Sequence, residues 1–352
     1  MPCFTHDDSR MNGQTGTTKV LIIRLSSIGD IVLTTPVIRA VHQQWPAEVH
    51  VLTKKGFVQI LSPNPYIGKV IPLEKSLGDT IRTLRAERYD LVIDLHKNIR
   101  TRLIRLALRR PSLAFRKLNG AKWLMTALHI DRLPRIHLVD RYFQALAPKG
   151  IQPDGQGLDY FIDPKDRVQP QEWVNGAYVA VALGAAHATK QIPEEKLVDI
   201  LSQVDLPILL LGGGNEQTLG DRLVATLTGR EVVNLAGRLS LGQSADVIRQ
   251  ARVVLTPDTG MMHIAAAFQK PIISVWGNTI PAFGMYPYLR EGSPEGQIWE
   301  VGGLHCRPCS KIGHESCPKG HFRCMLDQPA TAIANSIRDW GESDQIPLQE
   351  HL

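Results

Sequence analysis

Short apolar runs alternate with segments of helical pattern along the first half of the chain. The first run, residues 19–25 (KVLIIRL), is almost continuously apolar, as in a parallel strand that is buried on both faces. Helices are expected over residues 31–41 and 77–88. Three further apolar runs are expected to be strands: residues 49–53, 69–73 and 89–96. This alternation predicts an α/β fold with a doubly wound, Rossmann-like sheet.

The second half of the chain repeats the alternation. Five apolar runs are expected to be its strands: residues 178–183, 207–214, 232–237, 253–255 and 271–277. Pro193 is well placed to begin a helix over residues 194–201. A last helix is expected over residues 329–340, and it could cross back to pack on the first half. The second half is therefore predicted to be another α/β sheet.

The length of the chain and its loop composition predict two domains. A chain of 352 residues exceeds one comfortable hydrophobic core. Glycines and prolines interrupt residues 155–173, which we interpret as the hinge region. We expect a polar, disordered leader over residues 1–18, an N-terminal domain over residues 19–168 and a C-terminal domain over residues 172–340.

Composition and charge narrow the class of protein. Hydrophobic residues make up 43% of the chain and charged residues 21%, as in soluble globular proteins. The polar N-terminus lacks the apolar core of a signal peptide, so we expect a cytoplasmic protein. The net charge of +6 indicates an anionic partner. Nucleic acid is the weaker choice, because aromatic residues make up only 6% of the chain and no zinc-finger spacing occurs.

Two turns between a strand and a helix carry the first candidate chemistry. Asp258, Thr259 and Gly260 form one of them. Ligands bind at the carboxyl ends of parallel strands, and free N–H groups at a helix start attract phosphate. Helix capping alone would explain these residue types equally well. The turn over residues 26–30 has the same design, and Asp30 at its end is well placed to act as a general base.

Two more loops of the second half are suited to a nucleotide. Lys190 follows the first strand of this half and is a phosphate-binding candidate, although a plain surface lysine is as common. The glycines at residues 212–214 let a backbone approach a nucleotide closely, and Glu216 beyond them can accept hydrogen bonds from ribose hydroxyls.

Residues 97–122 form a basic stretch with nine cationic side chains and no acidic one. The nine are Lys97, Arg100, Arg102, Arg105, Arg109, Arg110, Arg116, Lys117 and Lys122. Apolar residues at helical spacing predict that part of the stretch is an amphipathic helix. A solvated basic face would explain it, but an anionic partner such as phosphate, carboxylate or lipid head groups is favoured. Arg100 follows a strand end and is expected to face the cleft.

Three segments together resemble one known family. Residues 25–36 (LSSIGDIVLTTP) resemble the first loop of glycosyltransferase family 9, the ADP-heptose:lipopolysaccharide heptosyltransferases. Residues 94–101 (DLHKNIRT) look like the second cleft loop of this family, and residues 258–263 (DTGMMH) resemble its nucleotide-sugar signature. The likeness spans residues 19–340 in the family's order. It implies the GT-B fold, in which two Rossmann-like domains face a central cleft.

The resemblance also implies a reaction and a set of site residues. The reaction would be an inverting, metal-independent transfer of heptose from ADP-heptose to the inner core of lipopolysaccharide, on Kdo-lipid A or a heptosyl acceptor, with Asp30 as the general base. The implied donor-binding residues are Lys190, Glu216, Asp258, Thr259, Gly260 and His263. The acceptor-binding residues would be Ser27, Gly29, Lys97, Arg100 and Arg102.

Cofactor and partners follow from the same resemblance. No cofactor would be required, and ADP-heptose would be the donor substrate. The partners would be this nucleotide sugar and a lipopolysaccharide precursor at the cytoplasmic face of the inner membrane, contacted peripherally through the basic stretch. We expect a monomer without a nucleic-acid partner. One departure concerns the loop before Lys190, where the family often has hydroxyl residues and this chain has Ala185 and Ala186; Thr189 is the nearest substitute.

The C-terminal half also contains a cluster of cysteines. Four of the five cysteines lie within 19 residues: Cys306, Cys309, Cys317 and Cys324. Clustered cysteines in a cytosolic protein favour a structural zinc site over disulfides. The spacing is not that of a standard zinc finger, so reduced, packed thiols are favoured and a structural zinc site is the alternative.

Two other functions are compatible with these residues. One is a related glycosyltransferase that uses another nucleotide sugar. The other is a non-catalytic nucleotide- or glycan-binding module on the same fold. Asp30 distinguishes a binding module from a transferase. A binding module would tolerate the replacement of Asp30 by asparagine, whereas a transferase that needs this base would lose turnover.

Overall fold

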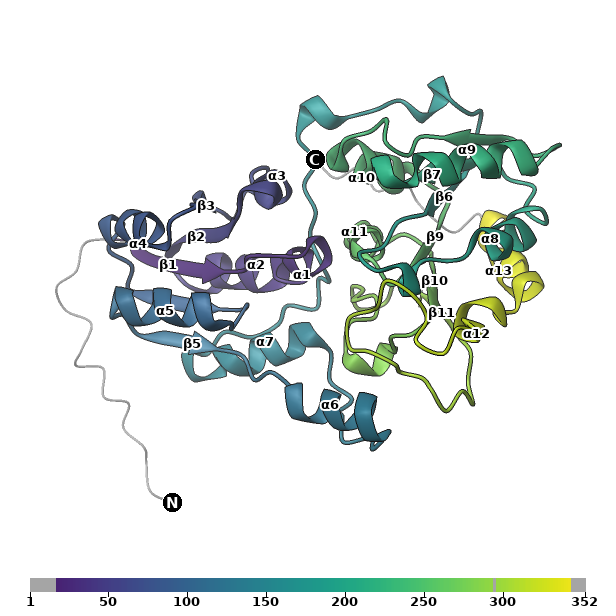
Figure 1. The fold of residues 1–352 in the computed structure, drawn as a ribbon. Helices are drawn as coiled ribbons and strands as arrows, with labels where there is room; N and C mark the ends of the chain where they lie inside the picture. The colour runs from purple at the N-terminus through teal and green to yellow at the C-terminus, as the bar shows by residue number, and fades with distance from the viewer. Residues whose placement is uncertain (1–16, 294–295, 343–352) are drawn as a thin grey trace, which may run out of the picture.

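Two parallel β-sheets, one in each half of the chain, organise the structure (Figure 1). The computed structural model describes residues 17–293 and 296–342. The N-terminal sheet has the strand order β3-β2-β1-β4-β5, and the C-terminal sheet has the order β11-β10-β9-β6-β7-β8. All neighbouring strands in both sheets are parallel. The predicted α/β class is therefore confirmed. Of the leader predicted over residues 1–18, residues 1–16 lie outside the described residues.

The N-terminal half contains the strands that the apolar runs predicted and a fifth, short one. The strands are β1 (Thr18–Ile23), β2 (Ala47–Lys54), β3 (Lys69–Leu73), β4 (Leu91–Asp94) and β5 (Ser112–Ala114). The helices are α1 (Ile28–Val32), α2 (Thr35–Gln44), α3 (Val58–Leu61), α4 (Leu77–Ala86), α5 (Ile99–Leu108), α6 (Asn119–Leu128) and α7 (Leu138–Leu146). Strand β5 escaped prediction because its three residues are only partly buried and lie within the basic stretch.

The first predicted helix is in fact two helices. A single helix was expected over residues 31–41, but α1 ends at Val32 and α2 begins at Thr35. Pro36 lies in the first turn of α2, where its missing N–H costs nothing. The hydroxyl of Thr34 donates to the carbonyl of Ile31 (2.6 Å), so a side chain satisfies a carbonyl that the break exposes. The break lets the short helix α1 start at the mouth of the sheet.

The C-terminal half follows the same plan. Its strands are β6 (Val179–Ala182), β7 (Ile208–Leu211), β8 (Val232–Asn234), β9 (Val253–Pro257), β10 (Ile272–Trp276) and β11 (Gln297–Glu300). Its helices are α8 (Glu194–Leu201), α9 (Gln217–Thr226), α10 (Leu241–Gln250), α11 (Gly260–Ala267), α12 (Arg323–Leu326) and α13 (Ala330–Glu342). Strand β9 includes Pro257, where the sequence had suggested an end at Leu255.

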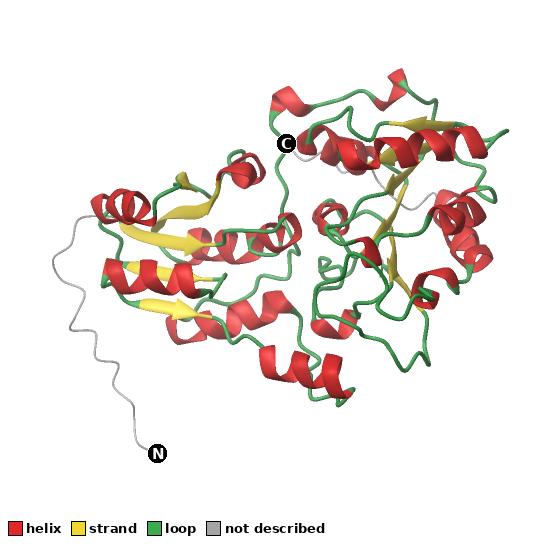
Figure 2. Cartoon of the chain, in the orientation of Figure 1, coloured by secondary structure: helices red, strands yellow, loops and turns green. Residues whose placement is uncertain are grey.

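Helices cover both faces of each sheet (Figure 2). Alternate residues of β1 face the two helical layers: Val20 and Ile22 share a core with α2 and α7, whereas Leu21 and Ile23 pack with α4 and α5. All four side chains are completely buried. Burial on both faces explains why this strand is a continuous apolar run rather than an alternating one.

The last helix packs differently from what the sequence suggested. We expected that it could cross back to the N-terminal domain. Instead α13 contacts α8, β9 and β10, and its residues Ile333 and Ile337 are buried in the core of the C-terminal sheet. The apolar stripe of α13 fits this sheet face, so the expectation of a crossover was wrong for residues 330–342.

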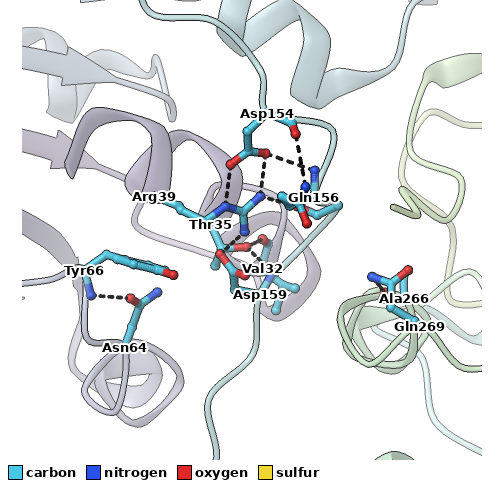
Figure 3. A network of polar contacts seen from close by, with 11 residues as sticks. Val32, Thr35, Arg39, Asn64, Tyr66, Asp154, Gln156, Asp159, Ala266 and Gln269 are labelled. Carbon is cyan, nitrogen blue, oxygen red and sulfur yellow. Dashed lines mark hydrogen bonds and ion pairs between the residues drawn. The ribbon is translucent and has the colours of Figure 1, made fainter. Parts of the chain in front are cut away.

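The linker between the halves is bonded to both of them. Buried Arg39, on α2, donates to both carboxylate oxygens of Asp154 (2.7 and 2.9 Å) and to the carbonyl of Gly157 (2.9 Å), and it pairs with Asp159 (Figure 3). In the same part of the linker, the carbonyl of Gly155 accepts from the backbone N–H of Glu291 on the C-terminal half (3.0 Å). Farther along, Asp166 accepts a hydrogen bond from the hydroxyl of Ser240 (2.8 Å), also on the C-terminal half.

The two halves meet where α1 contacts α11. A Cβ atom on Gly29 would lie 2.5 Å from Cδ2 of His263 and 3.3 Å from Cα of Gly260. A Cβ atom on Gly260 would lie 2.7 Å from Cγ2 of Ile28. Both distances to side chains are shorter than real contacts of a Cβ atom, so glycine is required on each side. The turns at residues 26–30 and 258–260 therefore face each other directly.

The contact yields a stability prediction. We expect Gly29→Ala to lower the free energy of unfolding by about 1–3 kcal/mol, because the added methyl group overpacks the contact with His263. Urea denaturation of the full chain measures the effect. Gly120→Ala is the matched control, since a Cβ atom at Gly120 in α6 meets nothing within 4 Å. Equal stabilities for Gly29→Ala and the unsubstituted protein would show that the helices are not held this close.

Candidate active site

Two adjoining cavities lie between the halves, at the carboxyl ends of their strands. The first cavity, of about 400 Å³, is lined by both facing turns and by the glycine loop of the C-terminal half. The second cavity, of about 460 Å³, is lined by basic side chains from both halves. Asp30, Lys190 and Asp258 line both cavities. The structure thus brings together three residues that the sequence singled out separately.

Asp30 is held by a fixed set of donors. Its Oδ1 atom pairs with the guanidinium of Arg24 (2.5 Å), and its Oδ2 atom accepts from the backbone N–H (3.2 Å) and the hydroxyl (3.0 Å) of Ser27. Burial raises the pKa of Asp30, but the charge of Arg24 and the hydrogen bonds from Ser27 outweigh it and hold the pKa below that of an ordinary carboxyl group. Asp30 is therefore ionised at neutral pH.

Arg24 is a residue of the candidate site that the sequence did not reveal. It lies just beyond β1 and is 7% exposed. Besides Asp30, its guanidinium donates to the carbonyl of Leu95 (2.5 Å), the hydroxyl of Tyr142 (3.0 Å) and the carbonyl of Ser26 (2.9 Å). This network fixes the position of the Asp30 carboxylate. The only available signal was a cation at the end of a buried apolar strand.

Lys190 and Asp258 form a second ion pair across the site. The lysine Nζ atom lies 2.7 Å from Oδ2 of Asp258, and the hydroxyl of Thr279 donates to the same oxygen (2.8 Å). Asp258 is 8% exposed, and the Lys190 side chain is 15% exposed. The carboxylate holds the ammonium group at the junction of the two cavities.

His263 and Glu216 line the first cavity. His263 is 2% exposed, and within the described residues its Nδ1 atom has no hydrogen-bond partner. Burial lowers the pKa of His263 to about 4, so the ring is neutral at pH 7. The Glu216 carboxylate accepts from the backbone N–H of Gly213 (2.8 Å). A Cβ atom on Gly184 or Gly212 would come within 3.0 Å of the Glu216 side chain. Thr259 and Gly260, at the start of α11, complete this wall.

Ala185 and Ala186 do line the first cavity, without a side-chain hydroxyl. Thr189, the expected substitute, is 2% exposed and engaged elsewhere. Its hydroxyl donates to the carbonyl of His314 (3.1 Å) and accepts from the N–H of the same residue (2.8 Å). Thr189 therefore bonds this loop to the cysteine-rich segment, residues 305–324, and does not point a hydroxyl into the cavity.

Of the expected acceptor residues, the structure brings Ser27 and Gly29 to Asp30 but not the other three. Lys97 and Arg102 line a separate surface groove, and Arg100 is exposed and lines neither cavity around Asp30. The Nζ atom of Lys97 donates to the carbonyl of Phe115 (3.0 Å), so this lysine holds the neighbouring loop. Arg100 lies near the start of α5 with an exposed side chain, and its expected position facing the cleft stays a prediction.

Other cations take their place beside Asp30. Lys117 and Lys122, from the far end of the basic stretch, line the second cavity together with Arg141 on α7 and Lys311 of the cysteine-rich segment. Arg141 is 5% exposed, and its Nε atom has no hydrogen-bond partner within the described residues. These residues lie far apart along the chain, so the sequence could not show that they line one cavity.

The cysteines do not form the zinc site that their clustering suggested. Within the described residues, no group of three or more His, Cys, Asp or Glu side chains could hold a metal ion. The closest contacts are from Sγ of Cys306 to Nε2 of His321 (3.6 Å) and from the thiol of Cys309 to the carbonyl of Cys306 (2.8 Å). Burial raises the pKa of Cys309 to about 11 and that of Cys324 to about 12, so both stay protonated. The arrangement agrees with packed thiols.

Comparisons with known proteins agree with this geometry. Residues 78–308 match the profile of glycosyltransferase family 9 (heptosyltransferase). Lipopolysaccharide heptosyltransferase 1 of Pseudomonas aeruginosa is 28% identical over 343 residues, which cover 88% of this chain and 91% of the relative.

Two solved structures share the fold. The Escherichia coli ADP-heptose lipopolysaccharide heptosyltransferase II has a TM-score of 0.70 at 19% identity, covering 92% of this chain and 98% of the other. The E. coli heptosyltransferase WaaC with ADP has a TM-score of 0.63 at 21% identity, covering 92% and 100%. Because the family profile covers more than half of the sequence and the fold is shared, the chain belongs to glycosyltransferase family 9 and is a glycosyltransferase with the GT-B fold.

Proposed function

We propose that this protein transfers heptose from ADP-heptose to an acceptor sugar of the lipopolysaccharide inner core, with inversion at the anomeric carbon. The curated relatives carry the name lipopolysaccharide heptosyltransferase. The observation that carries the proposal is the position of Asp30, an ionised carboxylate that lines both cavities. A base in this position can take a proton from an acceptor in one cavity while the donor occupies the other.

The first cavity suits the nucleotide. Glu216 and the glycine loop at residues 212–214 line the same cavity. In this position the carboxylate of Glu216 can accept hydrogen bonds from the ribose hydroxyls. The neutral ring of His263 forms part of the wall of the same cavity. The backbone N–H groups of Thr259 and Gly260, at the start of α11, would face the diphosphate.

The proposed reaction is a single displacement. Asp30 accepts the proton of the acceptor hydroxyl as the oxygen attacks the anomeric carbon of the heptose. The bond from this carbon to the diphosphate breaks on the opposite face, and ADP leaves. Lys190 and the N–H groups at the start of α11 stabilise the charge that develops on the leaving group. In this proposal Lys190 supplies the positive charge that a metal ion provides in other transferases, and Asp258 is its positioning residue.

A transferase for another nucleotide sugar is the second candidate, favoured by Ala185 and Ala186 in place of hydroxyl residues. A panel of nucleotide sugars decides between the two. With Kdo-lipid A as the acceptor, we expect ADP release from ADP-heptose and no release of UDP or GDP from the corresponding sugars. Release of UDP or GDP alone would overturn the choice of donor.

Asp30→Asn tests the base. We expect its turnover to fall by a factor on the order of 10²–10⁴, because the amide cannot accept the proton. Asp79→Asn, at an exposed position on α4, is the matched control and should keep full turnover. Full activity of Asp30→Asn would instead point to a binding module or to another base.

The ion pair with Arg24 predicts a shifted pH profile. Arg24→Met removes the charge that lowers the pKa of Asp30 and leaves the burial that raises it. We therefore expect the acidic limb of kcat/KM to move to higher pH by about 1–3 units, as Asp30 becomes protonated earlier. Arg24→Lys keeps the charge and should move the limb less. An unchanged limb in Arg24→Met would mean that Asp30 is not the titrating base.

We also propose that the protein meets the membrane through its N-terminal half, at the cytoplasmic face and as a monomer. In the described part of the chain, no helix is both long and apolar enough to cross a bilayer. Large exposed hydrophobic side chains are concentrated on and just after α5 and α6: Ile99, Leu103, Leu106, Trp123, Leu128 and Ile130. The basic stretch surrounds them, and cations beside apolar side chains are typical of peripheral contact with anionic lipids.

Vesicle binding tests this contact. We expect the protein to sediment with vesicles of phosphatidylcholine and phosphatidylglycerol, and several-fold less with phosphatidylcholine alone. The double variant Trp123→Ser/Leu128→Ser should lose most of the binding, whereas Val224→Ser, an exposed apolar residue on α9, should not. Equal binding by both variants would exclude the α6 region as the membrane contact.

A further inference from the structure

The second cavity contains more positive charge than its own residues balance. Six Lys and Arg side chains line it, against two carboxylates. Arg24 is paired with Asp30 (2.5 Å), and Lys190 is paired with Asp258 (2.7 Å). The remaining four form no ion pair within the described residues: Lys117, Lys122, Arg141 and Lys311. A cavity with four unpaired cations is suited to a ligand with more than one anionic group.

Three of these cations come from the N-terminal half, and they are partly desolvated. Burial and the charge of Arg141 lower the pKa of Lys122 to about 8, and its ammonium group lies 5.0 Å from the centre of the Phe283 ring. Burial also lowers the pKa of Lys117. Within the described residues, the one hydrogen bond of the Arg141 guanidinium goes to the carbonyl of Phe283, at 3.4 Å. An anion bound here would offset the cost of holding these groups charged.

Lys311 comes from the other half, on the cysteine-rich segment over residues 305–324. This segment is fastened to the donor side of the site. The backbone N–H of Cys309 donates to the carbonyl of Asn278 (3.2 Å), and Arg307 donates to the carbonyls of Gly277 (2.5 Å) and Thr279 (2.9 Å). His314 forms the contacts with Thr189 described above. The packed thiols and these bonds hold a loop whose tip, Lys311 and Ile312, lines the second cavity.

We propose that the cysteine-rich segment is an acceptor-binding element, in which Lys311 joins Lys122 and Arg141 to hold a carboxylate or phosphate group of the acceptor. The proposal rests on the proposed function, since it assigns a role in acceptor binding to a segment with no role in that reaction so far. Lys311 has no hydrogen-bond or ion-pair partner in the described residues and lies close enough to Lys117 and Lys122 to lower the pKa of both. A shared anion would offset the repulsion between these three cations.

This arrangement makes the acceptor a bridge between the halves. Lys122 and Arg141 belong to the N-terminal half and Lys311 to the C-terminal half, so an anion held by all three links them next to Asp30. Ile312, which is 57% exposed, lies beside Lys311 and offers an apolar surface to the same ligand. In this proposal the cysteine-rich segment binds the acceptor rather than a metal ion.

Kinetics with Kdo-lipid A and ADP-heptose test the proposal. We expect Lys311→Ala to raise the KM for the acceptor by about tenfold or more and to leave the KM for ADP-heptose within about twofold. Lys311→Arg should restore most of the affinity. Lys319→Ala is the matched control, because Lys319 is an exposed lysine of the same segment that does not line the cavity. An unchanged acceptor KM in Lys311→Ala would overturn the proposal.

Direct binding separates this proposal from the proposed function. Calorimetry with free Kdo probes a carboxylate, and calorimetry with inorganic phosphate probes a phosphate, neither of which requires turnover. Weaker binding of Kdo by Lys311→Ala assigns a carboxylate to the site, and weaker binding of phosphate alone assigns a phosphate. If both probes bind Lys311→Ala as they bind the unsubstituted protein, Lys311 is not part of an anion site. If the unsubstituted protein releases no ADP from ADP-heptose but Lys311→Ala binds a probe more weakly, the proposed donor is rejected and the anion site is retained.

Discussion

The close approach of α1 to α11 is the constraint on which the site depends. Each helix starts at the carboxyl end of a central strand of its sheet, and a glycine on each side lets the two backbones touch. This contact places Asp30 of the N-terminal half beside the residues of the C-terminal half that line the first cavity. A side chain at either glycine would move the proposed base away from the proposed nucleotide site.

Charge in the site is organised by pairing. Asp30 and Asp258 each have a cation of their own, which keeps one carboxylate ionised and holds one ammonium group in position. Among the described residues that line the second cavity, the charged side chains without an ion pair are all cations. Holding these cations in a partly desolvated cleft costs free energy, which a bound anion would offset. Under the proposed function, the same residues would therefore select an anionic acceptor.

The sequence predicted the two sheets well, because strands buried on both faces are continuous apolar runs that need no knowledge of distant residues. It also identified Asp30, Lys190, Glu216, Asp258 and His263, which the structure places around one pair of cavities. It failed where the outcome depends on orientation or on distance in space. The position of α5 decides that Lys97 and Arg102 line a separate groove, and the docking of the halves decides that Arg141 and Lys311 line one cavity. The split between α1 and α2 is a local effect of Pro36 that helical periodicity does not register.

The two halves are joined at several places besides the contact between α1 and α11. In the linker, the carbonyl of Gly155 accepts from the backbone N–H of Glu291 in the C-terminal half (3.0 Å), next to the residues that Arg39 binds to α2. Away from the linker, the hydroxyl of Tyr288 donates to Asp140 on α7 (3.0 Å). The spacing of the two turns that face each other at the site therefore depends on residues that lie outside the site.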